Sequence, residues 1–377
     1  MVSGRDDRRK LLRAKTELLC WGFKPNEALE EVFIAQNPYH DRRTGNAGVQ
    51  VALAEKLVAN VPTGNRYNAY SPYTLEKQQG MFYIVKDEVL IARCEPVPAP
   101  QWYHQLTSDG TPMGAVILQE GFNTLIAAIY NRCAYWRDED QCLFCAINTA
   151  GAAKRKSPQQ FAEAVEAAFT VDPRSTLDLT AGNTLLPDRG ALTYLDVLRA
   201  IKERVNIPIC VEISPPDEDK HLDMLVEAGA DAFMMNLEIG DDQLRRLFCP
   251  GKFKIPKDRY FDAWKHALEL VGRSKVSSVL IAGLESREST LRTAQELIEF
   301  GIIPTIMPLR PNDGCYLENF VVPSPDNIEY MSSRVGQLLY KYNLDCRSHP
   351  GCISCAACAI EVDYRELEMI AADSAAL

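Results

Sequence analysis

The chain has 377 residues, 46% of them hydrophobic, and a formal net charge of −10. This hydrophobic fraction can build a large core, and the negative balance argues against binding to nucleic acid or to anionic membranes. There is no apolar run of about 18 residues, and the N-terminus is charged, so the sequence predicts neither a membrane span nor a signal peptide. We therefore expect a cytoplasmic protein.

Residues 1–95 predict a small α+β accessory region. A weak helical periodicity covers residues 11–20. Two apolar runs, residues 81–85 and 88–92, are separated by two polar residues and predict a hairpin. The proline-rich residues 96–100 predict a stiff linker to the next region.

From residue 124 onward, short apolar runs alternate with amphipathic segments. This alternation predicts a parallel sheet in which each strand is followed by a helix. The predicted strands are 124–130, 175–179, 208–213, 232–237, 276–281 and 303–307, and the predicted helices are 158–169, 194–205, 220–228, 257–271, 289–300 and 325–342. Because a closed TIM barrel has eight such units, we expect an open, partial (βα)6 barrel over residues 96–342. A cysteine-rich tail, residues 343–377, follows it.

Cys133, Cys142 and Cys145 follow the first predicted barrel strand. Four thiolates close a zinc site or an iron–sulfur cluster, whereas three on a four-iron cluster leave one iron open to a small molecule. Zinc would need a fourth ligand, and the odd local count and missing secretory signal disfavour a disulfide. The charged residues 135–141 argue against inert buried thiols. A [4Fe–4S] cluster is therefore favoured, with zinc and inert thiols as alternatives.

The spacing C-x8-C-x2-C, with Phe144 directly before the last cysteine, resembles the radical SAM superfamily, although the superfamily's usual first gap is shorter. It implies a partial barrel in which S-adenosylmethionine (SAM) binds the open iron and is reductively cleaved to a 5′-deoxyadenosyl radical. Over about residues 100–360 the chain also resembles the biotin-synthase-like subgroup often encoded beside a nitrilase. The stretches that carry this resemblance are residues 102–112, 187–190, 250–252, 308–311 and 351–358.

The resemblance places SAM contacts just past the predicted strands, at the edge where parallel sheets bind ligands. Gly182 and Asn183 lie in the stretch implied to hold the SAM amino group; an ordinary turn is the alternative for Gly182. Asn236 and Glu238 alternate onto one face and suit ribose hydroxyls, with a solvated strand end as the alternative. Phe144 joins these cofactor contacts through its place in the cysteine pattern.

Lys252 is the favoured partner of the SAM carboxylate, and Lys254 and Arg259 are its rivals. An ordinary surface lysine is the alternative. Ile281 and Gly283 lie in a stretch that resembles the segment whose backbone flanks the adenine.

Two further residues are singled out by their place on the predicted strands. The subgroup implies an acidic residue directly before a Pro-Pro pair, where this chain has Ser214. Glu212 shares the face of Ser214 and is assigned the carboxylate role in its place. Arg310, after the sixth strand, either holds an anionic group of the substrate or closes the barrel with a salt bridge.

Cys346, Cys352, Cys355 and Cys358 form a second group in the tail. Their spacing suits an auxiliary iron–sulfur cluster, with structural zinc or a mobile tail as alternatives. The subgroup's tail resembles only the last three, so Cys346 is an optional ligand.

The leading hypothesis is a radical SAM enzyme, an oxidoreductase or transferase acting on a small molecule in a biosynthetic pathway. Its cofactors would be a [4Fe–4S] cluster, SAM and a second cluster, and its electron donor a protein such as flavodoxin or ferredoxin. The alternatives are a sulfur-inserting enzyme of the biotin synthase type and a non-catalytic iron–sulfur or zinc protein on a barrel scaffold.

Overall fold

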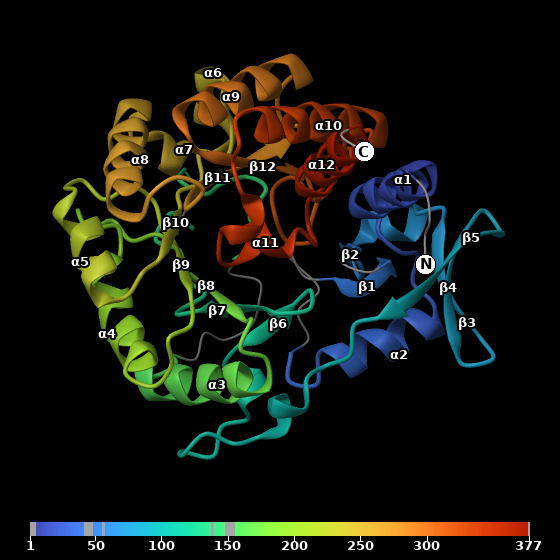
Figure 1. Ribbon diagram of the computed structural model, residues 1–377, viewed down its shortest axis with the longest axis horizontal. Helices are drawn as coiled ribbons and strands as arrows, with labels where there is room; N and C mark the ends of the chain where they lie inside the picture. The colour runs from blue at the N-terminus through green and yellow to red at the C-terminus, as the bar shows by residue number, and fades with distance from the viewer. Residues whose placement is uncertain (1–4, 41–47, 55–56, 137–138, 148–154, 376–377) are drawn as a thin grey trace.

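The computed structural model describes residues 5–40, 48–54, 57–136, 139–147 and 155–375. Within these residues a five-stranded sheet has the order β2-β1-β5-β4-β3, and a seven-stranded sheet has the order β12-β11-β10-β9-β8-β7-β6. Figure 1 shows the larger sheet as the wall of an open barrel ringed by helices, with the N-terminal elements to one side.

The larger sheet is the partial barrel predicted from the sequence. Strands β7 to β12 are parallel neighbours in chain order, as expected for six βα units. The sequence prediction missed β6, a short edge strand that pairs antiparallel with β7. The strands are β6 Leu118–Glu120, β7 Thr124–Ala128, β8 Thr176–Thr180, β9 Ile209–Glu212, β10 Ala232–Met234, β11 Val276–Ala282 and β12 Ile303–Pro308.

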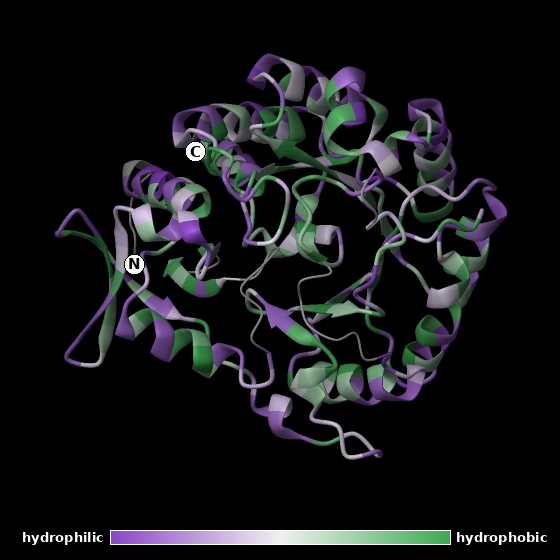
Figure 2. Ribbon diagram, turned by 180° about the vertical axis from the view of Figure 1, so that it is seen from behind, coloured by the Kyte–Doolittle hydropathy of each residue, from purple (hydrophilic) through white to green (hydrophobic). Residues whose placement is uncertain are grey.

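The helices around the sheet begin and end at recognisable local signals. The Ser157 hydroxyl accepts a hydrogen bond from the Gln160 backbone amide at the start of α3. The Gln160 side-chain oxygen accepts from the Ser157 backbone amide, which completes a capping box. Helix α5 ends at Gly229, whose φ of 116° suits glycine. Figure 2 shows hydrophobic and hydrophilic residues alternating along these helices, as amphipathic packing requires. The helices are α3 Pro158–Val171, α4 Ala191–Lys202, α5 Lys220–Ala228, α6 Asp242–Phe248, α7 Pro250–Phe253, α8 Lys257–Val271, α9 Arg287–Phe300 and α10 Pro325–Lys341.

The N-terminal region contains more regular structure than the sequence predicted. The predicted hairpin is confirmed as β4 and β5, and the weak helical pattern belongs to α1, whereas α2, β1, β2 and β3 were missed. One continuous hydrophobic core includes residues of this region and of the barrel, such as Leu12 and Leu177. The elements are α1 Arg5–Trp21, α2 Glu27–Gln36, β1 Val49–Ala54, β2 Leu57–Val61, β3 Tyr73–Gln78, β4 Met81–Lys86 and β5 Val89–Pro96.

The tail turns back into the centre of the molecule. Its short helix α11, Cys352–Cys355, lies inside the ring of helices, and α12, Glu361–Ala375, lies between α10 and α1 (Figure 1). Among the described residues, no helix combines the length and apolar character needed to cross a membrane.

Candidate active site

Backbone hydrogen bonds fasten the first cysteine segment over the carboxyl ends of the barrel strands. The Ala134 amide donates to the Asn183 carbonyl at 2.7 Å, just past β8. The Leu143 amide donates to Phe248 at 2.9 Å, at the end of α6. Gly182 packs so closely that a Cβ there would lie 2.0 Å from the Arg132 carbonyl oxygen. The segment therefore has a defined place beside the loop that follows β8.

The three thiols of this segment share one electrostatic environment. Burial raises the pKa of Cys133, and it raises the pKa of Cys145 to about 12. The pKa of Cys142 is raised first by a hydrogen bond with the Cys249 thiol and then by burial. The Lys252 ammonium acts in the opposite direction and lowers the pKa of all three thiols. Lys252 is therefore a cation common to the whole cysteine set.

A cavity lies next to this cysteine segment and is lined by polar side chains from several strand ends. Five of the residues predicted as cofactor contacts line it: Gly182, Asn183, Glu212, Asn236 and Lys252. Its other lining residues are Ala181, Arg189, Tyr194, Ile213 and Ser214.

Glu212 and Asn236 form a fixed hydrogen-bonded pair on the cavity wall. The Asn236 amide nitrogen donates to Glu212 Oε1 at 2.6 Å, and its oxygen accepts from the Val279 backbone at 2.9 Å. These two bonds fix which end of the amide faces Glu212. Burial raises the pKa of the Glu212 carboxyl group, and the Lys252 ammonium partly offsets this effect. The wall thus presents acceptor and donor groups side by side.

Glu238 was expected to share a strand face with Asn236, but the structure places it beyond the end of β10 and pairs it with Lys252. The prediction continued the strand to residue 237 and placed Asn236 and Glu238 on one face, but β10 ends at Met234. The backbone then turns, and Glu238 has a left-handed φ of 70°. Its carboxylate forms a buried ion pair with Lys252, with side-chain exposures of 8% and 13%. Two predicted SAM contacts are therefore partners of each other.

The remaining predicted contacts lie outside the residues that line the cavity. Ile281 donates its amide to the Glu238 carbonyl at 2.8 Å, and Gly283 follows at the end of β11 with a φ of 108°. Phe144 packs against the hydrophobic core. Arg310 is only 5% exposed; its Nη2 donates to the Asn60 carbonyl at 3.0 Å, whereas Nε and Nη1 have no partner among the described residues.

Sequence reasoning gave no role to Arg189, Tyr194 or Cys249, which are neighbours of the site. Arg189 lies in the stretch 187–190, which carried the family resemblance but received no role. It forms an ion pair with Asp217 at 2.7 Å, and its Nε has no partner among the residues that the structure describes. Tyr194 donates to the Glu212 carbonyl at 2.7 Å. No spacing signal links Cys249 to Cys142, because tertiary folding brings α6 to the cysteine segment.

Cys352, Cys355 and Cys358 gather inside the barrel rather than at its rim. The Cys352 amide donates to Asp178 Oδ2 at 3.0 Å, on β8. Burial raises the pKa of all three thiols, which also act on one another, and the Glu120 carboxylate is a common further cause. These three cysteines are called the tail cysteine site below.

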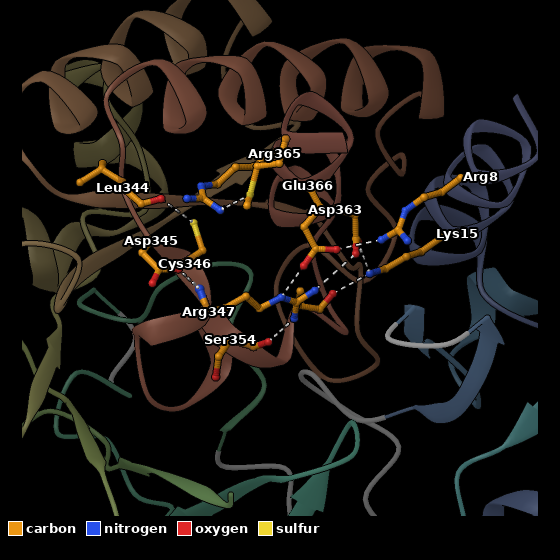
Figure 3. Close-up of polar contacts among 12 residues, drawn as sticks. Arg8, Lys15, Leu344, Asp345, Cys346, Arg347, Ser354, Asp363, Arg365 and Glu366 are labelled. Carbon is orange, nitrogen blue, oxygen red and sulfur yellow. Dashed lines mark hydrogen bonds and ion pairs between the residues drawn. The ribbon is translucent and has the colours of Figure 1, made fainter. Parts of the chain in front are cut away.

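Cys346 lies apart from this set. Its thiol is fully buried and contacts the Leu344 carbonyl at 3.9 Å (Figure 3). Burial raises its pKa to about 12, and the charged groups that act on it are those of Arg365, Glu361, Asp345 and Arg347, with no other cysteine among them.

Two buried carboxylates connect the surroundings of the two cysteine sets. Asp178 is 1% exposed, and its pKa is raised to about 7 by burial and then by the charge of Glu212. Glu212 in turn faces the cavity beside the first set. Asp178 on β8 and Glu212 on β9 thus place carboxyl groups between the tail cysteine site and the cavity beside the first cysteine set.

Residues 129–298 match the sequence model of the Radical SAM superfamily. This segment, which contains Cys133, Cys142 and Cys145 and strands β8 to β11, is similar to the radical SAM superfamily. The chain is similar to bacteriochlorophyllide c C-7(1)-hydroxylase of Chlorobaculum limnaeum, at 24% identity over 64% of this chain and 66% of that protein. It is also similar to lipoyl synthase of Thermus thermophilus, at 28% identity over 43% of this chain and 50% of that protein. The chain thus spans only about half to two thirds of the lengths of these relatives.

Solved structures are similar to this chain at lower sequence identity. Methylornithine synthase gives a TM-score of 0.48 at 20% identity and covers 59% of this chain and 64% of that one. A radical SAM methyltransferase from Sphaerobacter thermophilus gives a TM-score of 0.45 at 17% identity and covers 77% of this chain and 81% of that one. Both matched proteins are enzymes by name.

The superfamily implies a [4Fe–4S] cluster and SAM, and the described residues of this chain fit both. The three thiols are partly exposed beside the cavity, and glycine at position 182 lets the next loop approach them. The cavity offers the carboxylate, amide and ammonium groups that complement an amino acid and a ribose. Within the described parts of the chain, no three His, Cys, Asp or Glu side chains converge as ligands of a single metal ion do. The cysteine sets are thus defined by loop position and mutual electrostatics.

Proposed function

We propose that Cys133, Cys142 and Cys145 hold a [4Fe–4S] cluster at which SAM is reductively cleaved to a 5′-deoxyadenosyl radical that abstracts hydrogen from a small-molecule substrate. The observation that carries this proposal is the cysteine segment fastened beside a cavity of carboxylate, amide and ammonium groups. The protein's own part is to orient both reactants and exclude water.

The cavity residues divide the recognition of SAM among them. The Lys252 ammonium faces the SAM carboxylate, and the backbone at Gly182 and Asn183 receives the amino group. Asn236 and Glu212, held together at 2.6 Å, bind the ribose hydroxyls. Glu238 holds Lys252 in position through the buried ion pair. We assign the adenine end of the ligand to the backbone of Ile281 and Gly283 and to packing near Phe144.

The tail cysteine site holds a second iron–sulfur cluster, with Cys352, Cys355 and Cys358 as its ligands. The mutual influence of these three thiols supports the set, and the separate surroundings of Cys346 argue against a fourth thiolate. Three ligands leave one iron open, so this site can take part in the reaction at substrate.

Arg310 is the proposed anchor for an anionic group on the substrate. Arg310 is only 5% exposed, and two of its guanidinium nitrogens have no partner among the described residues. A buried guanidinium with free N–H groups matches a carboxylate or another oxyanion. Residues 1–95 are proposed as an accessory region, 96–342 as the catalytic barrel and 343–377 as the tail. A flavodoxin or ferredoxin in the cytoplasm would supply the electron.

A sulfur-inserting reaction is the second candidate. Two observations favour it: the tail cysteine site lies inside the barrel, and two relatives are lipoyl synthases at 28% identity. Insertion would consume sulfide from the tail cysteine site, so it predicts loss of about one sulfide per turnover, whereas hydrogen abstraction followed by rearrangement or coupling leaves the sulfide count unchanged.

Anaerobic reconstitution, followed by iron and sulfide counts and detection of 5′-deoxyadenosine with dithionite and SAM, tests the first cluster. The wild type should bind about eight irons, and Cys142→Ala should lose about four of them together with all 5′-deoxyadenosine. Cys94→Ala is the matched control, because Cys94 is a buried thiol of the N-terminal sheet and should keep both properties. Continued SAM cleavage by Cys142→Ala would contradict the assignment.

A further inference from the structure

The N-terminal region reaches across to the tail cysteine site through a buried lysine. Lys15, on α1, is 1% exposed, and its ammonium donates to the Ala356 carbonyl at 2.7 Å. Ala356 lies between Cys355 and Cys358 and has a left-handed φ of 55°. Lys15 therefore holds the turn that carries two of the three tail cysteines.

A second N-terminal residue contacts the same turn from β2. The Asn60 side-chain amide donates to Cys358 Sγ at 3.5 Å, and its backbone amide donates to the Ala357 carbonyl at 2.9 Å. The Asn60 carbonyl accepts from Arg310 at 3.0 Å. Asn60 thus joins the cysteine turn to the guanidinium proposed above as an anion anchor.

Charge is distributed unevenly around the tail cysteine site. The Lys15 ammonium donates to the Ala356 carbonyl at 2.7 Å, and Arg310, in the loop after β12, donates to the Asn60 carbonyl at 3.0 Å. On the barrel wall, the Asp178 carboxylate of β8 accepts from the Cys352 amide at 3.0 Å. Lys15 and Arg310 are thus placed to offset negative charge at the sulfurs.

Lys15 is also part of an ion-pair network that ties α1 to α12. Its ammonium pairs with Asp363 at 2.7 Å, where both side chains are 1% exposed. Arg347 pairs with Glu366 at 2.7 Å, and Arg8 of α1 pairs with the same carboxylate at 2.8 Å (Figure 3). A buried ion pair adds little to stability beyond what an apolar pair would give, so stability alone does not explain a buried lysine here. The hydrogen bond from Lys15 to the Ala356 carbonyl, in the cysteine turn, therefore suggests a role at the tail cysteine site.

We propose that Lys15 and Asn60, supplied by the N-terminal region, are positioning residues that complete the tail cysteine site and raise the reduction potential of the cluster bound there. This inference rests on the tail cluster of the proposed function. Reduction adds negative charge to a cluster, and a nearby ammonium and an N–H···S hydrogen bond both stabilise the added charge. The N-terminal region then contributes functional side chains to the tail cysteine site.

The potential of the tail cluster tests the proposal, measured in the Cys142→Ala background so that signals of the first cluster are removed. Full-length protein is reconstituted anaerobically and titrated with dithionite, with the reduced cluster followed by electron paramagnetic resonance. Lys15→Met should shift the midpoint to a more negative potential, and Asn60→Leu should shift it in the same direction by less. Lys15→Arg, which keeps the charge, should stay near the parent value.

Arg8→Gln is the matched control, because it breaks an ion pair between the same two helices without touching the cysteine turn. It should leave the midpoint unchanged. A Lys15→Met protein with full tail iron and an unshifted midpoint would overturn the inference. If Lys15→Met does not fold, Asn60→Leu decides the question on its own. The iron content of the Cys142→Ala parent is measured before any Lys15 variant is made. A parent without tail iron would overturn the proposed tail cluster itself, not the role of Lys15.

Discussion

The two cysteine sites of this molecule are built in different ways. The first lies at the rim of the barrel, where backbone hydrogen bonds from Ala134 and Leu143 fasten a single segment to its neighbours. The tail cysteine site lies inside the barrel, and side chains from α1, β2, β6, β8 and the loop after β12 surround it. The first is shaped by close backbone approach and the second by buried charge.

Because the two sites are built differently, we expect them to respond differently to substitutions and to pH. A site shaped by backbone contacts should respond to added side-chain volume at its glycines, because carbonyl groups cannot rotate away as side chains do. A site shaped by buried charge should respond to removal of a charge and to pH. Substitutions at each site can therefore test the comparison directly.

The largest effect is expected from Gly182→Val. A Cβ at this position would lie 2.0 Å from the Arg132 carbonyl oxygen and 2.8 Å from Cys133 Cα, so the cysteine segment must move. We expect loss of the first cluster, from about eight irons to about four, and loss of 5′-deoxyadenosine formation. Iron counts and spectra of the remaining cluster measure this, and the tail cluster in the same protein is the internal control. A Gly182→Val protein with full iron would show that the close approach is not required.

Lys252→Met should have the next largest effect. It leaves the Glu238 carboxylate buried without its partner, which costs about 3 kcal/mol of the free energy of unfolding. It also removes the cation proposed to face the SAM carboxylate, so the KM for SAM should rise on the order of tenfold. Urea unfolding and initial rates against SAM concentration measure the two effects.

Lys254→Met is the control for this prediction, and it also tests the rival lysine. The Lys254 side chain is 63% exposed in its ion pair with Asp140, so we expect a loss of at most about 1 kcal/mol and no change in KM. A larger effect on KM at Lys254 than at Lys252 would reverse the assignment of the SAM carboxylate.

The barrel was predictable because its strands are short apolar runs separated by amphipathic helices, a strong local signal. Edge strand β6 was missed because three residues carry too little pattern. Strand β2 was missed for another reason: Asn60 interrupts its apolar run, yet all five residues are buried. The Asn60 backbone amide and side-chain amide nitrogen both donate hydrogen bonds to the tail. Long-range contacts of this kind leave no periodicity in the sequence.

At the candidate site, too, sequence patterns predicted residues with local signals but not those placed by long-range contacts. Spacing singled out the cysteines of both sets, and positions on or just after predicted strands singled out Glu212 and Asn236. Lys252 was singled out by a family-like stretch that follows a short helix, and it lines the cavity together with Glu212 and Asn236. Spacing could not separate Cys346 from the tail cysteines, since four cysteines close in sequence give no information on which share a space. The positions of Lys15 and Asn60 depend on how α1 and β2 pack against the tail, which no local pattern encodes.

The smallest predicted effect concerns pH and the segment that leads into the tail cysteine site. His349 is fully buried, with Nδ1 2.6 Å from the Pro350 carbonyl oxygen, and burial lowers its pKa to about 4, with the charge of Lys275 acting in the same direction. The unfolded chain, with a histidine pKa of about 6.5, therefore binds more protons than the folded chain between these values. Stability from this group is complete above about pH 6.5 and is lost as the pH falls toward 4.

From about pH 7 to about pH 5, this one histidine should cost the folded protein about 2 kcal/mol. His349→Gln removes the titration while keeping a side-chain donor for the Pro350 carbonyl, so its urea-unfolding transition should lose that much less over the same interval. The comparison is made on reduced, metal-free protein, because cluster binding adds its own dependence on protons. Equal pH dependence in the two proteins would mean that His349 is charged or solvated in the folded state, and would remove the acid sensitivity that distinguishes the tail from the rim.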